Sequence, residues 1–108
     1  MGRLGRRFPF LFLALLAIGC ESRPFKELAL ADVALRSAQK VKAESLATDE
    51  FRKAENFYLR AKKDYTDGYF DSSRKHAEQA RLLAEKAEYA ALVKQRLIKG
   101  RDAESAEP

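Results

Sequence analysis

The sequence has one cysteine, one histidine and no tryptophan in 108 residues. A single cysteine, Cys20, excludes an intrachain disulfide and a cysteine metal cluster. A single histidine, His76, forms neither a metal site nor a catalytic triad by itself, and it is interpreted as a surface residue of a helix. The sequence also lacks a phosphate-binding loop, a His-Glu-x-x-His motif and a serine elbow motif. It therefore predicts a protein that is not an enzyme, with no metal site and no cofactor or small-molecule substrate.

Proline and glycine are scarce in the middle of the sequence, where Pro24 and Gly68 are the only such residues between positions 22 and 99. Good helix formers dominate this region, and no segment alternates as a β-strand does. The sequence therefore predicts an all-α fold, a three-helix antiparallel bundle built like a repeat hairpin, over residues 25–99. Helices are expected at about 25–47, 49–65 and 72–99, and a disordered tail at 100–108, because Gly100 is expected to end the last helix.

Apolar residues recur at steps of three and four in each predicted helix, which indicates one buried face per helix. In the last helix this face consists of alanine, whose small side chain lets two helix axes approach closely. The expected buried positions are Leu28, Ala31, Leu35, Ala38 and Val41, then Phe51, Ala54, Tyr58, Ala61 and Tyr65, then Ala77, Ala80, Ala84, Ala87 and Ala91.

The segments between the predicted helices contain residues that favour helix ends. Thr48 is expected to cap the second helix, with Asp49 and Glu50 in its first turn, where the helix dipole favours negative charge. Gly68 is expected to end this helix in the left-handed conformation, and Asp71 to cap the third helix.

No hydrophobic run is long enough to span a membrane, which takes about 20 apolar residues. The longest run, Phe8 to Ile18, follows a segment with three arginines and no acidic residue. A basic segment before a short apolar run is typical of a secretory signal. Residues 1–19 are therefore interpreted as a cleaved signal peptide.

The residues Leu16-Ala17-Ile18-Gly19-Cys20 resemble the lipobox of bacterial lipoproteins. The resemblance implies cleavage between Gly19 and Cys20, a diacylglyceryl group on the Cys20 sulfur and often a further acyl chain on its amine. Residues 20–24 would then form a lipidated linker. Two or three acyl chains suffice for stable membrane residence, whereas one chain holds only marginally. Glu21 is not the aspartate that marks inner-membrane retention, so the periplasmic side of the outer membrane is the expected location, with the inner membrane as the alternative.

Positive charge is concentrated in the signal segment. Loss of residues 1–19 would remove three arginines and no acid, and would lower the net charge from +5 to +2. The remaining charge does not indicate nucleic-acid binding. A cluster in the second helix is interpreted as a solvated face, with binding to anionic lipids or glycans as the alternative. Its residues are Arg52, Lys53, Arg60, Lys62 and Lys63.

Aromatic residues gather around the predicted hairpin between the second and third helices. They are interpreted as its small core, and some of them as an exposed surface for a protein partner. The candidates for that surface are Tyr58, Tyr65, Tyr69 and Phe70.

Residues 28–90 resemble a family of alanine-rich bacterial lipoproteins that is known only as a domain of unknown function. Its members often stand alone or precede an OmpA-type domain, and the resemblance implies no activity. Thr48 stands where the family has proline, and no OmpA-type domain follows in this sequence. The matching residues are Ala31, Ala34, Ala38, Phe51, Ala54, Ala61, Gly68, Tyr69, Phe70, Ala77, Ala80, Ala84 and Ala87.

These observations predict a membrane-anchored helical adaptor or scaffold of the cell envelope, which presents a small protein-interaction surface near its membrane. The alternative is a structural spacer that self-associates along the alanine face as a coiled coil. The two differ in the expected partner, which is an envelope protein in the first case and a second copy of the chain in the other.

Overall fold

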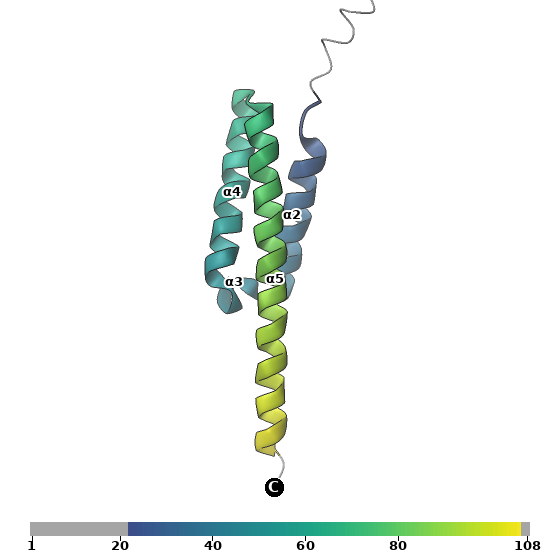
Figure 1. The fold of residues 1–108 in the computed structure, drawn as a ribbon, viewed down its shortest axis with the longest axis vertical. Coiled ribbons are helices and arrows are strands. Elements are labelled where there is room, and N and C mark those ends of the chain that lie inside the picture. The colour runs from purple at the N-terminus through teal and green to yellow at the C-terminus, as the bar shows by residue number, and fades with distance from the viewer. Residues whose placement is uncertain (1–21, 107–108) are drawn as a thin grey trace, which may run out of the picture.

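The computed structural model describes residues 22–106, which form four helices (Figure 1). No strand occurs in this range, so the predicted all-α fold is confirmed. The interpreted signal peptide 1–19 and the candidate lipidation site, Cys20, lie outside the described residues. The helices are α2 (Phe25–Lys40), α3 (Ala43–Leu46), α4 (Thr48–Asp67) and α5 (Phe70–Ala106).

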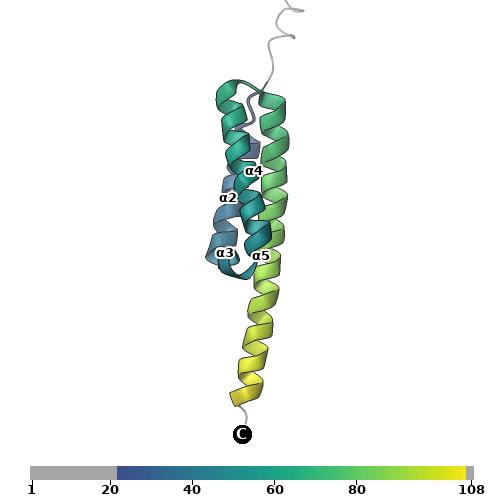
Figure 2. The ribbon, with the colours of Figure 1, turned by 90° about the vertical axis from the view of Figure 1, so that its left-hand side faces the viewer.

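Helix α5 is the axis of the bundle, and α2 and α4 pack on two sides of it (Figures 1 and 2). Helix α4 runs antiparallel to α5 across the turn at Gly68. Helix α2 runs parallel to α5, because Arg74 donates a hydrogen bond to the Ser22 carbonyl at one end and Gln95 donates to the Val41 carbonyl at the other. Toward its C-terminus, α5 extends past the end of the bundle (Figure 2).

The core consists almost entirely of alanine. Of the 14 buried apolar residues, all except Leu35 and Phe51 are alanine. Every alanine of the predicted α5 face is fully buried, which confirms that face as the contact between α5 and its neighbours. Ser73 belongs to the same row, although the sequence did not predict it. It is fully buried, and its hydroxyl donates a hydrogen bond of 2.7 Å to the Ala61 carbonyl oxygen across the hairpin.

The turn at Gly68 has the predicted left-handed geometry, with a φ angle of 87°. The Gly68 N–H donates to the Tyr65 carbonyl at 3.2 Å, and the Tyr69 N–H donates to the Asp64 carbonyl at 2.8 Å. These two bonds form a Schellman motif, which satisfies carbonyl groups that the helix end would leave without partners.

Replacing Gly68 with alanine is expected to destabilise the bundle by about 1–2 kcal/mol, because a β-carbon is strained in the left-handed conformation. No neighbouring atom lies within 4 Å of the added carbon, so the effect reports backbone strain alone. Urea unfolding followed by circular dichroism measures it. Gly100→Ala is the matched control: its added carbon is equally free, its position is helical, and alanine there is expected to leave global stability unchanged or slightly higher. Equal losses for the two variants would contradict the prediction.

The first helix, predicted over 25–47, is wrong beyond Lys40. Helix α2 ends at Lys40, Lys42 adopts a left-handed φ of 61°, and the short helix α3 follows. The segment contains neither glycine nor proline, so the local residues showed no sign of this break. It is stabilised from α5, where Gln95 donates to the Val41 carbonyl at 2.7 Å and Lys94 donates to the Leu46 carbonyl.

Two predictions on helix ends are also wrong. Thr48 does not cap α4, because its hydroxyl donates to the Glu44 carbonyl at 2.9 Å and links α3 to α4. Asp71 lies in the first turn of α5 rather than ahead of it, since α5 begins at Phe70. Asp49 and Glu50 occupy the first turn of α4, as predicted.

The tail 100–108, predicted to be disordered, is helical as far as Ala106, and Gly100 lies within α5. A glycine in a helix interior costs about 1 kcal/mol relative to alanine. This cost does not end a helix whose neighbouring residues have good helix propensity. The predicted range of the last helix, 72–99, is therefore too short at both ends.

Candidate interaction surfaces

The alanine face of α5 is not available to a second copy of the chain. All five of its predicted alanines have no exposed surface, because α2, α3 and α4 cover them. The expected self-association along this face would need the bundle to open. Any surface for a partner must therefore lie elsewhere on the molecule.

A polar cluster joins α4 to α5 next to the Gly68 turn. The Asp64 Oδ2 atom accepts a hydrogen bond of 2.7 Å from the Ser72 hydroxyl and lies 2.7 Å from His76 Nδ1. The His76 ring also packs against Phe57, with the ring centroids 5.8 Å apart. His76 was interpreted as a plain surface residue, and the structure corrects this, because its side chain is only 30% exposed and pairs with a carboxylate. Residues at equal distances before and after a tight helical turn face each other, and this rule could have placed Asp64 opposite Ser72, with His76 one helical turn further along α5.

This cluster does not have the geometry of a catalytic triad. In a triad the histidine removes the proton of the serine hydroxyl, so these two groups must contact each other. Here Ser72 and His76 both bind the same Asp64 oxygen. Among residues 22–106, no group of histidine, cysteine and acidic side chains is arranged to hold a metal ion. The arrangement links two helices.

The lowered pKa of Asp64 predicts that the bundle loses stability in acid. The hydrogen bond from Ser72, followed by the interaction with His76, holds the pKa of Asp64 below its ordinary value of 3.8. A carboxylate with a lowered pKa contributes stability above its unfolded pKa, and this contribution disappears as the pH falls through the folded value.

We therefore expect Asp64→Asn to be less stable than the natural protein at pH 7, and the difference to shrink as the pH falls below about 4. Urea unfolding at a series of pH values measures both effects. Asp102→Asn, at an exposed position of α5 beyond the bundle, should match the natural protein throughout. If the difference in free energy of unfolding between Asp64→Asn and the natural protein stayed constant with pH, the proposed stabilisation by ionised Asp64 would be contradicted.

The four predicted partner-surface residues do not form one surface. Tyr65, Tyr69 and Phe70 lie at the Gly68 end of the bundle, where the Tyr65 and Phe70 ring centroids are 5.6 Å apart. Tyr58 lies farther along α4, in a groove of about 360 Å³ between α2 and α4 that Leu35 also lines. Burial, followed by the negative charge of Asp32, raises the pKa of Tyr58 above its ordinary value.

The predicted basic cluster is also divided. By helical periodicity, Arg52, Lys53, Arg60 and Lys63 share the outer face of α4, opposite its buried residues, and all are exposed. Lys62 lies on a flank, with its ammonium 5.3 Å from the Tyr58 ring centroid. Binding of anionic lipids or glycans by these residues stays a prediction.

A surface that the sequence analysis missed lies on the outer side of α5. Its members are separated by seven, four and four residues, so they share one face of the helix, opposite the alanine face. Their side chains are between 37% and 72% exposed. Val93 and Leu97 belong to this outer face, because α2 and α4 pack on the other side of α5. We name this surface the outer stripe: Leu82, Tyr89, Val93 and Leu97.

The described residues therefore define an all-α bundle of one long central helix with two flanking helices. None of its helices has the length and apolar character that a membrane crossing requires. No family model, curated protein or solved structure matches the chain. The resemblance to the alanine-rich lipoprotein family stays a prediction.

Proposed function

We propose that this protein is a lipid-anchored helical adaptor of the bacterial cell envelope, which binds an amphipathic helix of an envelope protein on its outer stripe. The anchor is the diacylglyceryl group on Cys20, at the end of the lipobox-like segment. The anchor keeps the adaptor close to proteins of the same membrane and raises its effective concentration there.

The observation that supports a protein-binding role is the outer stripe itself. Large apolar side chains at helical spacing that remain exposed on a folded chain are typical of interaction sites. The stripe is about 22 Å long, from the 1.5 Å rise per residue between Leu82 and Leu97. This length matches about four turns of a partner helix.

Charge complementarity indicates the kind of partner. Lys86 lies one turn after Leu82, and Arg96 lies one turn after Val93, so both basic side chains border the stripe. Glu85 borders it as well, but its carboxylate is paired with Arg81 of the same helix at 3.2 Å. Acidic side chains beside the apolar residues of a partner helix would pair with them and fix its register. We therefore expect the partner to be an acidic amphipathic helix.

A photo-reactive amino acid at Leu97 in the full chain, expressed in living cells, tests this proposal. We expect it to cross-link to an acidic amphipathic segment of one envelope protein, identified by mass spectrometry, and Lys86→Glu to weaken the cross-link. The same probe at Leu59 is the matched control, because Leu59 and Leu97 are both 60% exposed on helices. Equal cross-linking from the two positions, or none from Leu97, would contradict the proposal.

The alternative is a self-associating spacer that uses the same stripe. Leu82 and Leu97 lie at nearly equal distances on either side of Tyr89, so two antiparallel copies would place leucine opposite leucine. Sedimentation equilibrium of the lipidated chain in detergent distinguishes the two functions. A dimer that Tyr89→Asp dissociates would favour the spacer, and a monomer would favour the adaptor.

A further inference from the structure

Three helix ends meet at the end of the bundle where the described chain begins. Helix α2 begins there, α4 ends there and α5 begins there (Figures 1 and 2). The chain entering α2 is held in place, because Pro24 is fully buried and the Ser22 carbonyl accepts a hydrogen bond of 2.9 Å from Arg74. Arg74 also approaches Glu27 of α2, with Nε 3.5 Å from the carboxylate oxygen. Ser22 is therefore fixed to this end of the bundle.

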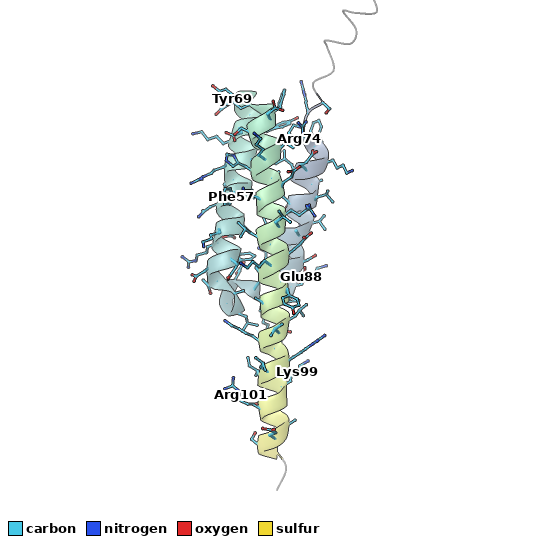
Figure 3. All side chains as sticks on the ribbon, in the orientation of Figure 1. Phe57, Tyr69, Arg74, Glu88, Lys99 and Arg101 are labelled. Carbon is cyan, nitrogen blue, oxygen red and sulfur yellow. The ribbon has the colours of Figure 1, made fainter. Side chains whose placement is uncertain are left out.

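The same end carries exposed aromatic rings. Phe25 is 62% exposed and Tyr69 is 66% exposed, and Figure 3 places Tyr69 at this end, together with Arg74. The Phe25 ring packs against the Tyr65 ring at a tilt of 56°, with ring centroids 5.3 Å apart, and Tyr65 in turn packs against Phe70. Nothing within the described part of the chain covers the outer faces of Phe25 and Tyr69. We name this group the aromatic end: Phe25, Tyr65, Tyr69 and Phe70.

The position of the proposed anchor determines what lies next to the aromatic end. Cys20 is two residues before Ser22, so the chain between them spans about 7 Å at most. Acyl chains on Cys20 that are inserted in a bilayer therefore bring Ser22, and the bundle end that holds it, to the lipid headgroups. Aromatic rings are enriched at this depth, because it offers both apolar and polar surroundings.

We propose that the aromatic end inserts into the membrane interface and that Phe25 and Tyr69 are its contacts with lipid. This inference rests on the proposed lipidation of Cys20. Insertion gives the exposed rings an apolar surface to contact. It also adds a second, weaker membrane attachment beside the lipid anchor. The bundle then stands end-on on the membrane rather than lying flat.

The charges around the aromatic end are mixed, which distinguishes this surface from an anionic-lipid site. Arg23 and Lys26 are exposed there, and so are Asp67 and Asp71. Opposite charges in similar number give little net attraction to anionic headgroups. The aromatic end therefore needs no anionic lipid and can insert into a neutral phosphatidylcholine bilayer. Its insertion is insensitive to salt.

End-on attachment sets the height of the outer stripe above the membrane. Helix α5 begins at Phe70, so Leu82 lies about 18 Å and Leu97 about 40 Å along its axis. Figure 3 shows Lys99 and Arg101 at the opposite end of the molecule from Tyr69. The interaction surface is thus held beyond the headgroup layer, where a neighbouring periplasmic helix can reach it.

Because the sequence has no tryptophan, a single introduced tryptophan reports by its fluorescence whether its position contacts lipid. Phe25→Trp, Tyr69→Trp and Leu97→Trp are made separately in the full chain, and mass spectrometry establishes the lipid on Cys20. Each protein is then reconstituted into phosphatidylcholine vesicles that contain brominated acyl chains, which quench nearby tryptophan. Circular dichroism verifies that each variant remains helical. Leu97→Trp is the matched control, because its position is as exposed as Phe25 and Tyr69 but lies far from the aromatic end.

We expect the emission of Phe25→Trp and Tyr69→Trp to shift to shorter wavelength and to lose most of its intensity, at low and high salt alike, while Leu97→Trp is unaffected. Lipidated and vesicle-bound protein without quenching at positions 25 and 69 would overturn this inference and leave the proposed anchor intact. Equal quenching at position 97 would show a molecule lying flat and would also overturn it. An unmodified Cys20 would overturn the proposed function and this inference with it.

Discussion

Replacing Cys20 with serine is expected to remove the protein from the outer membrane and to leave the signal segment attached. The proposed modification needs the cysteine sulfur, and the lipobox resemblance implies that cleavage before residue 20 follows lipidation. Without lipidation, the two or three acyl chains that make membrane residence stable are absent. Each buried methylene group of such chains contributes about 0.8 kcal/mol to membrane binding. Separation of membranes by density, together with the intact mass of the protein, measures both consequences.

The double variant Cys20→Ser with Ser22→Cys is the matched control for this experiment. It keeps one thiol in the chain and moves it by two residues, out of the lipobox-like pattern. The hydrogen bond that Ser22 accepts from Arg74 uses its backbone carbonyl, so the substitution leaves it in place. We expect this variant to behave like Cys20→Ser. Lipid on the thiol introduced at position 22, or outer-membrane localisation of Cys20→Ser, would show that the pattern at residues 16–20 is not what directs anchoring.

Replacing Ala84 with leucine is expected to destabilise the bundle strongly. Ala84 is fully buried in a core cluster that includes Leu35 of α2 and Phe51 of α4. Extra methylene groups in a filled core cost about 1–3 kcal/mol and sometimes more. Small domains have a free energy of unfolding of about 0.05–0.15 kcal/mol per residue, so this cost is a large share of the total.

Thermal unfolding followed by circular dichroism measures the effect of Ala84→Leu. A loss of 1 kcal/mol lowers the melting temperature of a domain of this size by about 4–8 °C. Ala29→Leu is the matched control, because Ala29 is exposed on α2 and leucine has nearly the helix propensity of alanine. If both variants melted at the natural temperature, the close approach of the helices at Ala84 would be disproved.

Much of the fold followed from local features of the sequence. The alanine spacing in α5 predicted its buried face, and the glycine at position 68 predicted the left-handed turn. These features are local because burial of a helical face repeats with the helix period, and only glycine adopts a positive φ without strain. The i,i+4 pair of Asp32 and Arg36, with an oxygen–nitrogen distance of 2.9 Å, follows from the same periodicity.

The candidate surfaces were less predictable. The outer stripe has helical spacing, but spacing alone did not tell whether Val93 and Leu97 face the bundle or the solvent. The predicted aromatic surface was split for a similar reason, since Tyr58 faces α2 while Tyr65 and Tyr69 lie at the Gly68 end. Which face a neighbouring helix covers depends on the path of the whole chain.

The sequence by itself determined that the described chain is helical, where the hairpin turns and which side of each helix is apolar enough to bury, because propensity and periodicity act over a few neighbouring residues. The tertiary structure decided where α2 ends, how far α5 extends and which residues remain exposed. The break after Lys40 depends on Lys94 and Gln95, which lie 48 and 54 residues further along the chain than the carbonyl groups they bind. Such bonds form only when distant segments meet, and for that reason no local pattern predicts them.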